Sequence, residues 1–220
     1  MNIEQVRFNM VEQQIRTWDV LDTDVLDLLH TIKRENFVPQ AQREFALMDI
    51  ETPLTPLSAS ERMWTPKMEA RVVQDLDLKG DEHVLEIGTG SGYLTALLAA
   101  RTARVTSVEI DPALAKFASD NLAQTGITNA TVLTGDASRG WRGAAPFDVI
   151  VFTGSMEVLP EEVFSQLKAT GRVFAVVGKR PVMAAQLVTV TASGGRQART
   201  LFETVVAPLV NAAKAPAFVF

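Results

Sequence analysis

Residues 84–93 read VLEIGTGSGY, an apolar run that passes directly into a turn with glycine at every second position. A short apolar and β-branched run is typical of a buried strand, and the glycines allow a sharp turn and close approach of a ligand to the backbone. We expect a helix from Tyr93 to Arg101, whose first N–H groups would point at that ligand. The stretch therefore predicts a strand, a ligand-binding turn and a helix, in this order.

Outward from this unit, short apolar strands alternate with helices. This alternation requires right-handed crossovers and a parallel sheet. The end of the chain differs, because two β-rich runs flank Ser193-Gly194-Gly195 as in an antiparallel hairpin. We therefore predict an α/β fold with a mostly parallel sheet, an antiparallel C-terminal hairpin and helices on both faces. The predicted strands are 104–110, 130–134, 147–152, 172–177, 186–191 and 200–206, and the predicted helices are 112–124 and 160–167.

The first 75 residues have a different pattern. Apolar residues recur at helical spacing over 3–15 and 22–32, with Asp22 or Thr23 as the cap of the second helix. Prolines and a polar cluster at residues 58–62 predict a long irregular segment between Phe45 and Pro66, and such segments are often functional. A helix should follow from Pro66 to Leu76. We predict an N-terminal helical and loop extension, 1–75, that forms the substrate side of a ligand-binding domain, 76–220, within one compact unit.

The composition restricts the chemistry that the chain can perform. The sequence has 220 residues, no cysteine, two histidines and a formal net charge of −5 at pH 7. Disulfides, thiolate metal sites and thiol nucleophiles are thereby excluded, and we expect no bound metal. The negative charge gives no general attraction to nucleic acids or anionic membranes. With no apolar signal segment and no stretch long enough to span a bilayer, the sequence predicts a cytoplasmic protein. It does not predict an oligomeric state.

A carboxylate follows the glycine turn at the spacing of a nucleotide site. Glu109 ends the next strand about 20 residues after the first glycine, where it can hold both hydroxyls of a ribose. A dinucleotide site needs G-x-G-x-x-G, and Tyr93 occupies its third glycine position. The pattern acid-x-G-x-G-x-G instead resembles motif I of S-adenosylmethionine (SAM) dependent methyltransferases. This resemblance implies SAM as cofactor, with Glu86 near the methionine ammonium. It also implies binding by the turn residues Gly88, Thr89, Gly90 and Gly92.

Two later strand ends bear on the ligand and the substrate. The strand 130–134 is followed by Gly135-Asp136-Ala137, where an acid in this superfamily accepts the adenine amino group. The resemblance implies adenine binding by Asp136 and Ala137, although Asp136 could equally cap a turn. Residues 153–156, TGSM, lack the Asn/Asp-Pro-Pro-aromatic run with which adenine-N6 methyltransferases hold a flipped base. We therefore expect neither a base-amine substrate nor a nucleic-acid partner.

Several separate stretches, spread over nearly the whole chain, resemble the protein-L-isoaspartate O-methyltransferase family. They include RENFVP at 34–39, VLEIGTGSGY at 84–93 and APFDVI at 145–150. The resemblance implies a Rossmann-like SAM-dependent methyltransferase fold and a protein or peptide partner bearing isoaspartyl residues. It also implies methylation of L-isoaspartyl or D-aspartyl carboxylates in damaged proteins. Such a carboxylate is ionised at pH 7, so the reaction needs alignment with the methyl donor and no general base.

One segment departs from the family's pattern in the expected substrate loop. Members carry G-Q-T-I-S-x-P, whose serine and backbone meet the isoaspartyl carboxylate, whereas residues 60–66 here read SERMWTP. Trp64 takes the place of the serine and Thr65 offers a hydroxyl one residue later, so both are candidate catalytic positions. The apolar pair Met63-Trp64 can also be core packing. Trp64 argues against isoaspartyl turnover and keeps open two alternatives: a methyltransferase of the same descent with a different acceptor, and a non-catalytic SAM-binding protein.

Overall fold

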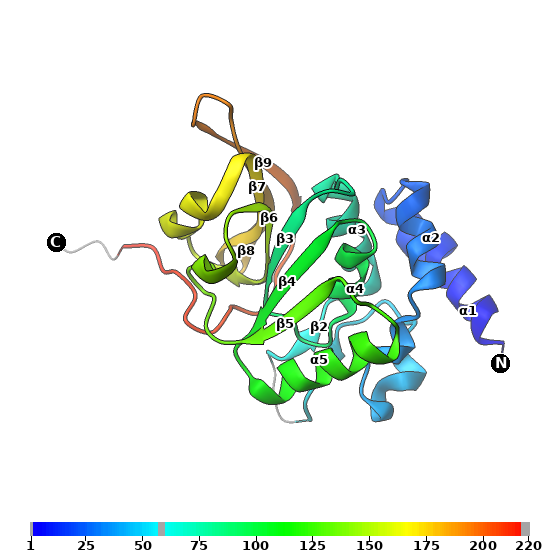
Figure 1. Ribbon diagram of the computed structural model, residues 1–220. Coiled ribbons are helices and arrows are strands. Elements are labelled where there is room, and N and C mark those ends of the chain that lie inside the picture. Colours follow the sequence, from blue (N-terminus) through cyan, green and yellow to red (C-terminus); the bar gives the residue numbers. More distant parts are fainter. Residues whose placement is uncertain (1, 57–59, 217–220) are drawn as a thin grey trace.

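The computed structural model describes residues 2–56 and 60–216. A seven-stranded sheet with the order β5-β4-β3-β6-β7-β8-β9 lies at its centre (Figure 1). Neighbouring strands from β5 to β7 pair in parallel, and β8 is antiparallel to both β7 and β9. The predicted mostly parallel α/β sheet with an antiparallel C-terminal hairpin is confirmed. Its strands are β3 (His83–Ile87), β4 (Arg104–Glu109), β5 (Ala130–Thr134), β6 (Phe147–Met156), β7 (Leu167–Lys179), β8 (Val182–Val190) and β9 (Arg196–Glu203).

Both faces of the sheet are covered. Side chains on one face, such as Val84, share a buried apolar cluster with the three α-helices that follow the N-terminal segment. Side chains on the other face, such as Leu85, belong to a second cluster beneath 3-10 helices and the C-terminal segment. Because alternate residues are buried on opposite sides, the central strands read as continuous apolar runs. The covering helices are α3 (Pro66–Leu76), α4 (Tyr93–Ala99), α5 (Pro112–Gln124), η5 (Arg142–Ala144) and η6 (Glu161–Gln166).

The N-terminal segment forms a helical layer beside α3, drawn in blue in Figure 1. Of the two predicted caps, Asp22 is the N-cap of α2, because its Oδ1 accepts the N–H groups of Asp24 at 2.9 Å and Val25 at 3.3 Å. Met10 and Leu29 belong to the same buried cluster as Val84, so one core extends across both halves of the chain. The elements are α1 (Ile3–Asn9), the π-helix η1 (Met10–Ile15), η2 (Arg16–Trp18), α2 (Thr23–Thr31), η3 (Arg34–Asn36) and η4 (Gln40–Phe45).

The segment between Phe45 and Pro66 is more ordered than predicted. Strands β1 (Thr52–Pro53) and β2 (Arg62–Met63) pair antiparallel as a small ribbon. Two-residue strands paired across a loop leave no periodic signal, so the local pattern could not reveal them. The part of the predicted irregular segment and polar cluster that falls on 57–59 lies outside the described residues.

The predicted hairpin exists, but its boundaries differ. β8 begins at Val182 because it pairs with β7 from there on, and β9 ends at Glu203. Val206 has left the sheet, and its carbonyl accepts the Ser155 hydroxyl at 3.0 Å. The helix predicted for 160–167 is the 3-10 helix η6. Since these boundaries depend on pairing partners far away in the chain, local propensity did not locate them.

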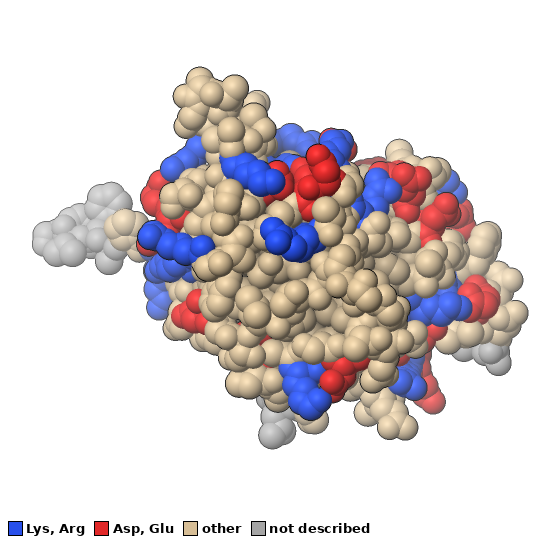
Figure 2. All heavy atoms as spheres, viewed as in Figure 1, with Lys and Arg blue, Asp and Glu red and all other residues tan. Residues whose placement is uncertain are grey.

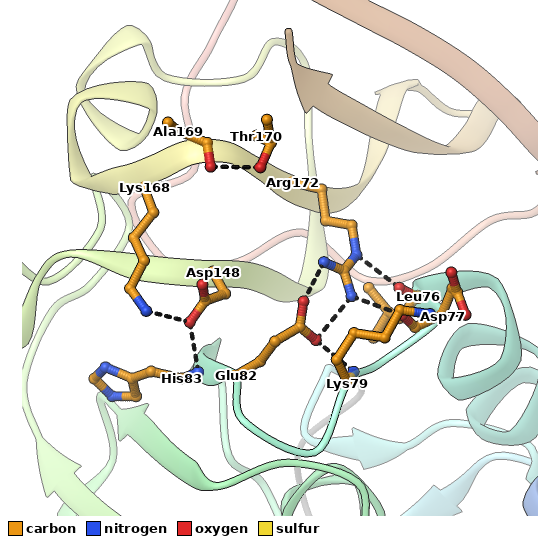
Figure 3. A network of polar contacts seen from close by, with 10 residues as sticks. All are labelled: Leu76, Asp77, Lys79, Glu82, His83, Asp148, Lys168, Ala169, Thr170 and Arg172. Atoms are coloured by element: carbon orange, nitrogen blue, oxygen red, sulfur yellow. Dashed lines mark hydrogen bonds and ion pairs between the residues drawn. The ribbon is translucent and has the colours of Figure 1, made fainter. Parts of the chain in front are cut away.

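A network of polar contacts holds the amino ends of the strands (Figure 3). Arg172 of β7 donates to both carboxylate oxygens of Glu82, at 2.6 and 3.0 Å. The same guanidinium donates to the carbonyls of Leu76 at 2.6 Å and Asp77 at 3.0 Å. These carbonyls lie at the C-terminal end of α3, where a helix leaves acceptors unsatisfied. Arg172 therefore ties α3 to the sheet at the end opposite the glycine turn.

Within the part of the chain that the structure describes, no helix is both long and apolar enough to cross a bilayer.

Candidate functional site

A cleft opens where the parallel strands β3, β4, β5 and β6 reach their carboxyl ends, the usual ligand position in open α/β sheets. A smaller cavity adjoins it at the glycine turn. Of the residues predicted from the sequence, the cleft brings together Trp64, Gly88, Gly90, Glu109, Asp136 and Ala137. Glu86 and Thr89 line the smaller cavity, together with Trp64 and two glycines. Thr65 and Gly92 are not among the described lining residues of either.

The glycine turn requires residues without side chains at two positions for different reasons. Gly88 has φ +94°, and a Cβ there would collide with Oγ1 of Thr153. The Thr153 hydroxyl can donate to the Ile87 carbonyl, 2.9 Å away, and to the Gly88 carbonyl, 2.7 Å away. It therefore joins the turn to β6. Gly92 has φ +82°, and its Cβ would lie 3.3 Å from Ala118 of α5. Gly92 thus permits helix packing, whereas Gly88 shapes the floor of the cleft.

Glu109 lies at the end of β4 and holds the glycine turn. Its Oε2 accepts the N–H of Gly90 at 2.8 Å, and its Oε1 accepts the N–H of Asp111 at 3.1 Å. The residue is 6% exposed and lines the cleft. Because a carboxylate has about four acceptor sites, two backbone bonds leave capacity for the hydroxyls of a ligand.

Glu86 is fully buried beneath the turn. Its Oε2 accepts hydrogen bonds from Thr95 at 2.5 Å and Ser107 at 2.7 Å. Its Oε1 has no hydrogen-bond partner among the described residues, and Glu86 lines the smaller cavity. Burial raises the pKa of Glu86 to about 8. A buried acceptor without a partner is costly, so a donor entering the cavity would be bound there. A ligand ammonium group fits this oxygen.

Asp136 is already engaged in local contacts. Its Oδ1 accepts the N–H of Ser138 and its Oδ2 accepts from the Asn211 amide, both at 2.8 Å. The N–H of Ser138 is the main cause that lowers the pKa of Asp136. The turn-capping alternative is therefore present in the structure. Asp136 also lines the cleft beside Ala137, and its contact with adenine stays a prediction.

Trp64 is both a core and a cleft residue. It is 7% exposed, and its indole meets Phe174 of β7 edge to face, with ring centroids 6.2 Å apart. It lines the cleft and the smaller cavity as well. Thr65 has another task, because its hydroxyl accepts the N–H of Met68 at 3.4 Å as the N-cap of α3. Their roles toward a substrate stay predictions.

Arg34 anchors the segment that carries Trp64. The guanidinium is fully buried and donates to the carbonyls of Ala46 at 2.7 Å and Trp64 at 2.6 Å. Its Nε donates to Glu69 of α3 at 3.0 Å. Burial raises the pKa of Glu69 to about 7 despite this partner. The N-terminal extension, the β1–β2 ribbon and α3 are thereby connected at one side chain.

Sequence reasoning missed several residues that lie in the cleft or beneath it. Ser107 pairs with Glu86 across β3 and β4, so the strand register would have indicated it. Arg62 lines both cavities, but nothing in its local pattern distinguishes it from a solvated arginine. Residues 206–210 form another part of the wall. They pass beside β6, where the N–H of Ser155 donates to the Ala207 carbonyl at 2.9 Å. Such a contact depends on the path of the chain and has no local sequence signal.

Most of the chain is similar to proteins of one kind. Residues 5–214 match the profile of the family described as protein-L-isoaspartate(D-aspartate) O-methyltransferase. The protein-L-isoaspartate O-methyltransferase of Brucella anthropi is 39% identical over 177 residues, which cover 80% of each chain.

Two solved structures share the fold. A protein-L-isoaspartate O-methyltransferase superposes with a TM-score of 0.79 at 24% identity, over 93% of this chain and 66% of its own. A Plasmodium falciparum protein, assigned as a β-aspartate methyltransferase and solved with S-adenosyl-L-homocysteine, gives 0.76 at 18% identity, over 96% and 99%. The extent of the family match and the identity to the Brucella protein together decide the relationship: the chain belongs to the protein-L-isoaspartate(D-aspartate) O-methyltransferase family.

Proposed function

We propose that this protein transfers the methyl group of SAM to the carboxylate of L-isoaspartyl or D-aspartyl residues in damaged proteins or peptides. The observation that carries the proposal is the cleft at the strand ends, in which the glycine turn and Glu109 meet the segment around Trp64. This cleft lies within a chain that matches the isoaspartyl methyltransferase family over residues 5–214. The proposal includes a cytoplasmic location, as expected from a chain without cysteine.

SAM is the cofactor of this family, and the residues of the cleft fit it. The free Oε1 of Glu86 supports binding of the methionine ammonium, since this buried oxygen has no partner among the described residues. Glu109, held by two backbone N–H groups, is suited to the ribose hydroxyls. When bound, SAM supplies an electrophilic methyl group on a sulfonium.

The chain's own contribution to the reaction is alignment and exclusion of water. An acceptor carboxylate is ionised at neutral pH, so its oxygen can bond to the methyl carbon as the carbon–sulfur bond breaks, and no base has to remove a proton. Trp64 and residues 206–210 wall the cleft and restrict water. Holding the reacting atoms in line in such a site accounts for large rate enhancements without acid–base groups.

A second candidate is methyl transfer by the same cleft to a different acceptor. The observation that favours it is the indole of Trp64, which lines both cavities. Its bulk occupies part of the space next to the glycine turn. A third possibility, SAM binding without turnover, is distinguished from both by the assay that follows.

The deciding experiment measures transfer of labelled methyl from SAM to an isoaspartyl peptide, with the aspartyl peptide of the same sequence as control. We expect label in the isoaspartyl peptide only, as a base-labile methyl ester. A Gly88→Val variant, in which the side chain meets Thr153, provides a matched protein without a functional turn. SAM binding without labelled peptide would contradict the proposal. A gain of turnover in Trp64→Ser over an inactive natural chain would favour the second candidate.

A further inference from the structure

The cleft has an unusual distribution of charge. Its described lining includes the carboxylates Glu51, Glu61, Glu109, Asp111 and Asp136, and the smaller cavity adds Glu69 and Glu86. Among the described residues that line these two cavities, Arg62 is the only basic one. Acidic walls suit a cationic cofactor. A guanidinium beside them needs a separate explanation.

The backbone of Arg62 is fixed while its side chain stays available. Arg62 begins β2 and pairs with Pro53 of β1. The next two residues, Met63 and Trp64, are buried at 5% and 7% exposure, and Arg34 donates to the Trp64 carbonyl at 2.6 Å. Arg62 itself is exposed, and its side chain forms no hydrogen bond or ion pair with any described residue. The ribbon therefore presents this guanidinium at a fixed place on the cleft wall.

Several of the nearby acids have other partners among the described residues. Glu109 accepts two backbone N–H groups, Asp136 accepts from Ser138 and Asn211, and Thr55 donates to Glu61. A guanidinium that has no partner among the described residues can offer its five donors to a ligand, in a planar fork that matches a carboxylate. Its position at the junction of the cleft and the smaller cavity puts it next to the glycine turn, where the reacting groups would meet.

We propose that Arg62 binds a carboxylate group of a ligand in this cleft. It thereby selects ligands that place a carboxylate next to the glycine turn. Two carboxylates can reach such a place: that of the methyl acceptor and that of the methionine part of the cofactor. If Arg62 binds the carboxylate of the methyl acceptor (the acceptor arm), the inference rests on the proposed function. If Arg62 binds the carboxylate of the cofactor (the cofactor arm), the inference requires only that the protein binds SAM. Lysine can replace the charge of Arg62 but not its bidentate geometry.

The test compares the natural chain with Arg62→Gln and Arg62→Lys. Arg199→Gln serves as the matched control, because Arg199 is an exposed arginine of β9 that is not among the described lining residues. Calorimetry gives the affinity for S-adenosylhomocysteine and for S-adenosyl-3-thiopropylamine, which lacks only the carboxylate. It also gives the affinity of an isoaspartyl peptide for the protein saturated with S-adenosylhomocysteine, and steady-state assays at saturating SAM give KM and kcat.

We expect Arg62→Gln to lower the affinity for one of the two ligands about tenfold, as the loss of a charge-assisted pair does. The affinity of Arg62→Lys should lie between those of Arg62→Gln and the natural chain. A higher KM and weaker peptide binding, with unchanged kcat and cofactor affinity, would identify the acceptor carboxylate. Weaker S-adenosylhomocysteine binding, with unchanged binding of the thiopropylamine, would identify the cofactor carboxylate. If all affinities and KM stay within twofold of the Arg199→Gln control, the inference is wrong.

Failure of the proposed function would be visible separately. If the natural chain binds the isoaspartyl peptide but does not methylate it, the function fails while the binding arm still tests Arg62. If the natural chain neither binds nor methylates the peptide, only the affinity for S-adenosylhomocysteine tests the inference. An unchanged affinity for S-adenosylhomocysteine in Arg62→Gln then overturns it.

Discussion

At the scale of single residues, Glu86 is a carboxyl group that folding holds neutral. Burial raises its pKa to about 8, although hydrogen bonds from Thr95 and Ser107 act in the opposite direction. In the unfolded chain the same group titrates near 4.5. Between these two pH values the folded chain holds more protons than the unfolded chain, so this group makes the free energy of unfolding fall as pH rises. The structure therefore gives up some stability at neutral pH to keep this oxygen inside.

This protonation should make cofactor binding depend on pH. An ammonium group beside Oε1 favours the ionised carboxylate, so binding lowers the pKa of Glu86 and releases a proton below pH 8. We expect the affinity for S-adenosylhomocysteine to increase from pH 6 to pH 8, by at most about tenfold per pH unit. Calorimetry in buffers of different ionisation enthalpy measures the proton release. Glu86→Gln should show neither the increase nor the release, and an equal pH dependence in that variant would refute the role of Glu86.

Glu109 provides a second prediction at this scale. Glu109→Gln keeps the size of the side chain but loses the charge that accepts the Gly90 and Asp111 N–H groups. We expect S-adenosylhomocysteine binding to weaken by about 1 to 3 kcal/mol while the protein stays folded. Thermal shift with ligand and circular dichroism measure the two effects. Glu162→Gln, at an exposed position of η6, is the control. Equal ligand shifts in both variants would contradict the ribose role.

At the scale of elements, the network around Arg172 attaches α3 to the sheet (Figure 3). Its side chain is 14% exposed and that of Glu82 is 10% exposed. Arg172→Gln would remove the guanidinium that donates to the Glu82 carboxylate and to the carbonyls of Leu76 and Asp77 at the end of α3. We expect the free energy of unfolding to fall by about 2 to 4 kcal/mol. Urea denaturation measures this loss, and Arg199→Gln should change it by less than about 0.5 kcal/mol.

The same variant separates stability from function. The network lies at the amino ends of the strands, whereas the cleft lies at their carboxyl ends. Folded Arg172→Gln should therefore bind S-adenosylhomocysteine as the natural chain does. A stability equal to that of Arg199→Gln, or a large loss of affinity in the folded protein, would show that the network has a different role.

Elements differ in how far the sequence predicts them. The strand and turn at 84–93 and the helix α5 are set by local residues, and the structure agrees with the predictions there. The β1–β2 ribbon depends on pairing between Thr52–Pro53 and Arg62–Met63, and so was missed. The residues of the candidate site also differ in how far the sequence predicts them. Gly88, Glu86 and Glu109 belong to a contiguous motif or to a strand end, whereas Arg62 and residues 206–210 reach the cleft only through the path of the chain.

At the scale of the whole molecule, one apolar core joins the predicted extension and the predicted ligand-binding domain. Met10, Leu29, Val84 and Phe174 belong to one buried cluster. The boundary predicted after residue 75 falls inside α3, which ends at Leu76. On the face seen in Figure 2, acidic and basic side chains are interspersed around a broad uncharged area. The shared apolar cluster therefore joins the two parts, in addition to polar contacts such as that of Arg34 with Glu69.

A shared core should make unfolding cooperative. We expect a single transition in urea, with coincident midpoints from tryptophan fluorescence and from far-ultraviolet circular dichroism. The three tryptophans report on different places, since Trp18 lies in η2, Trp64 beside the cleft and Trp141 before η5. Two separated transitions would instead show that the extension and the sheet unfold as independent domains.

The wall formed by residues 206–210 has a consequence for protein synthesis. These residues follow every strand of the sheet in the sequence, and backbone bonds join Ser155 to Ala207 at 2.9 Å and to Leu209 at 3.1 Å. A ribosome making this chain therefore releases the glycine turn and all seven strands of the large sheet before the last wall of the cleft. The complete cleft is therefore available to the cofactor only after these last residues have been made.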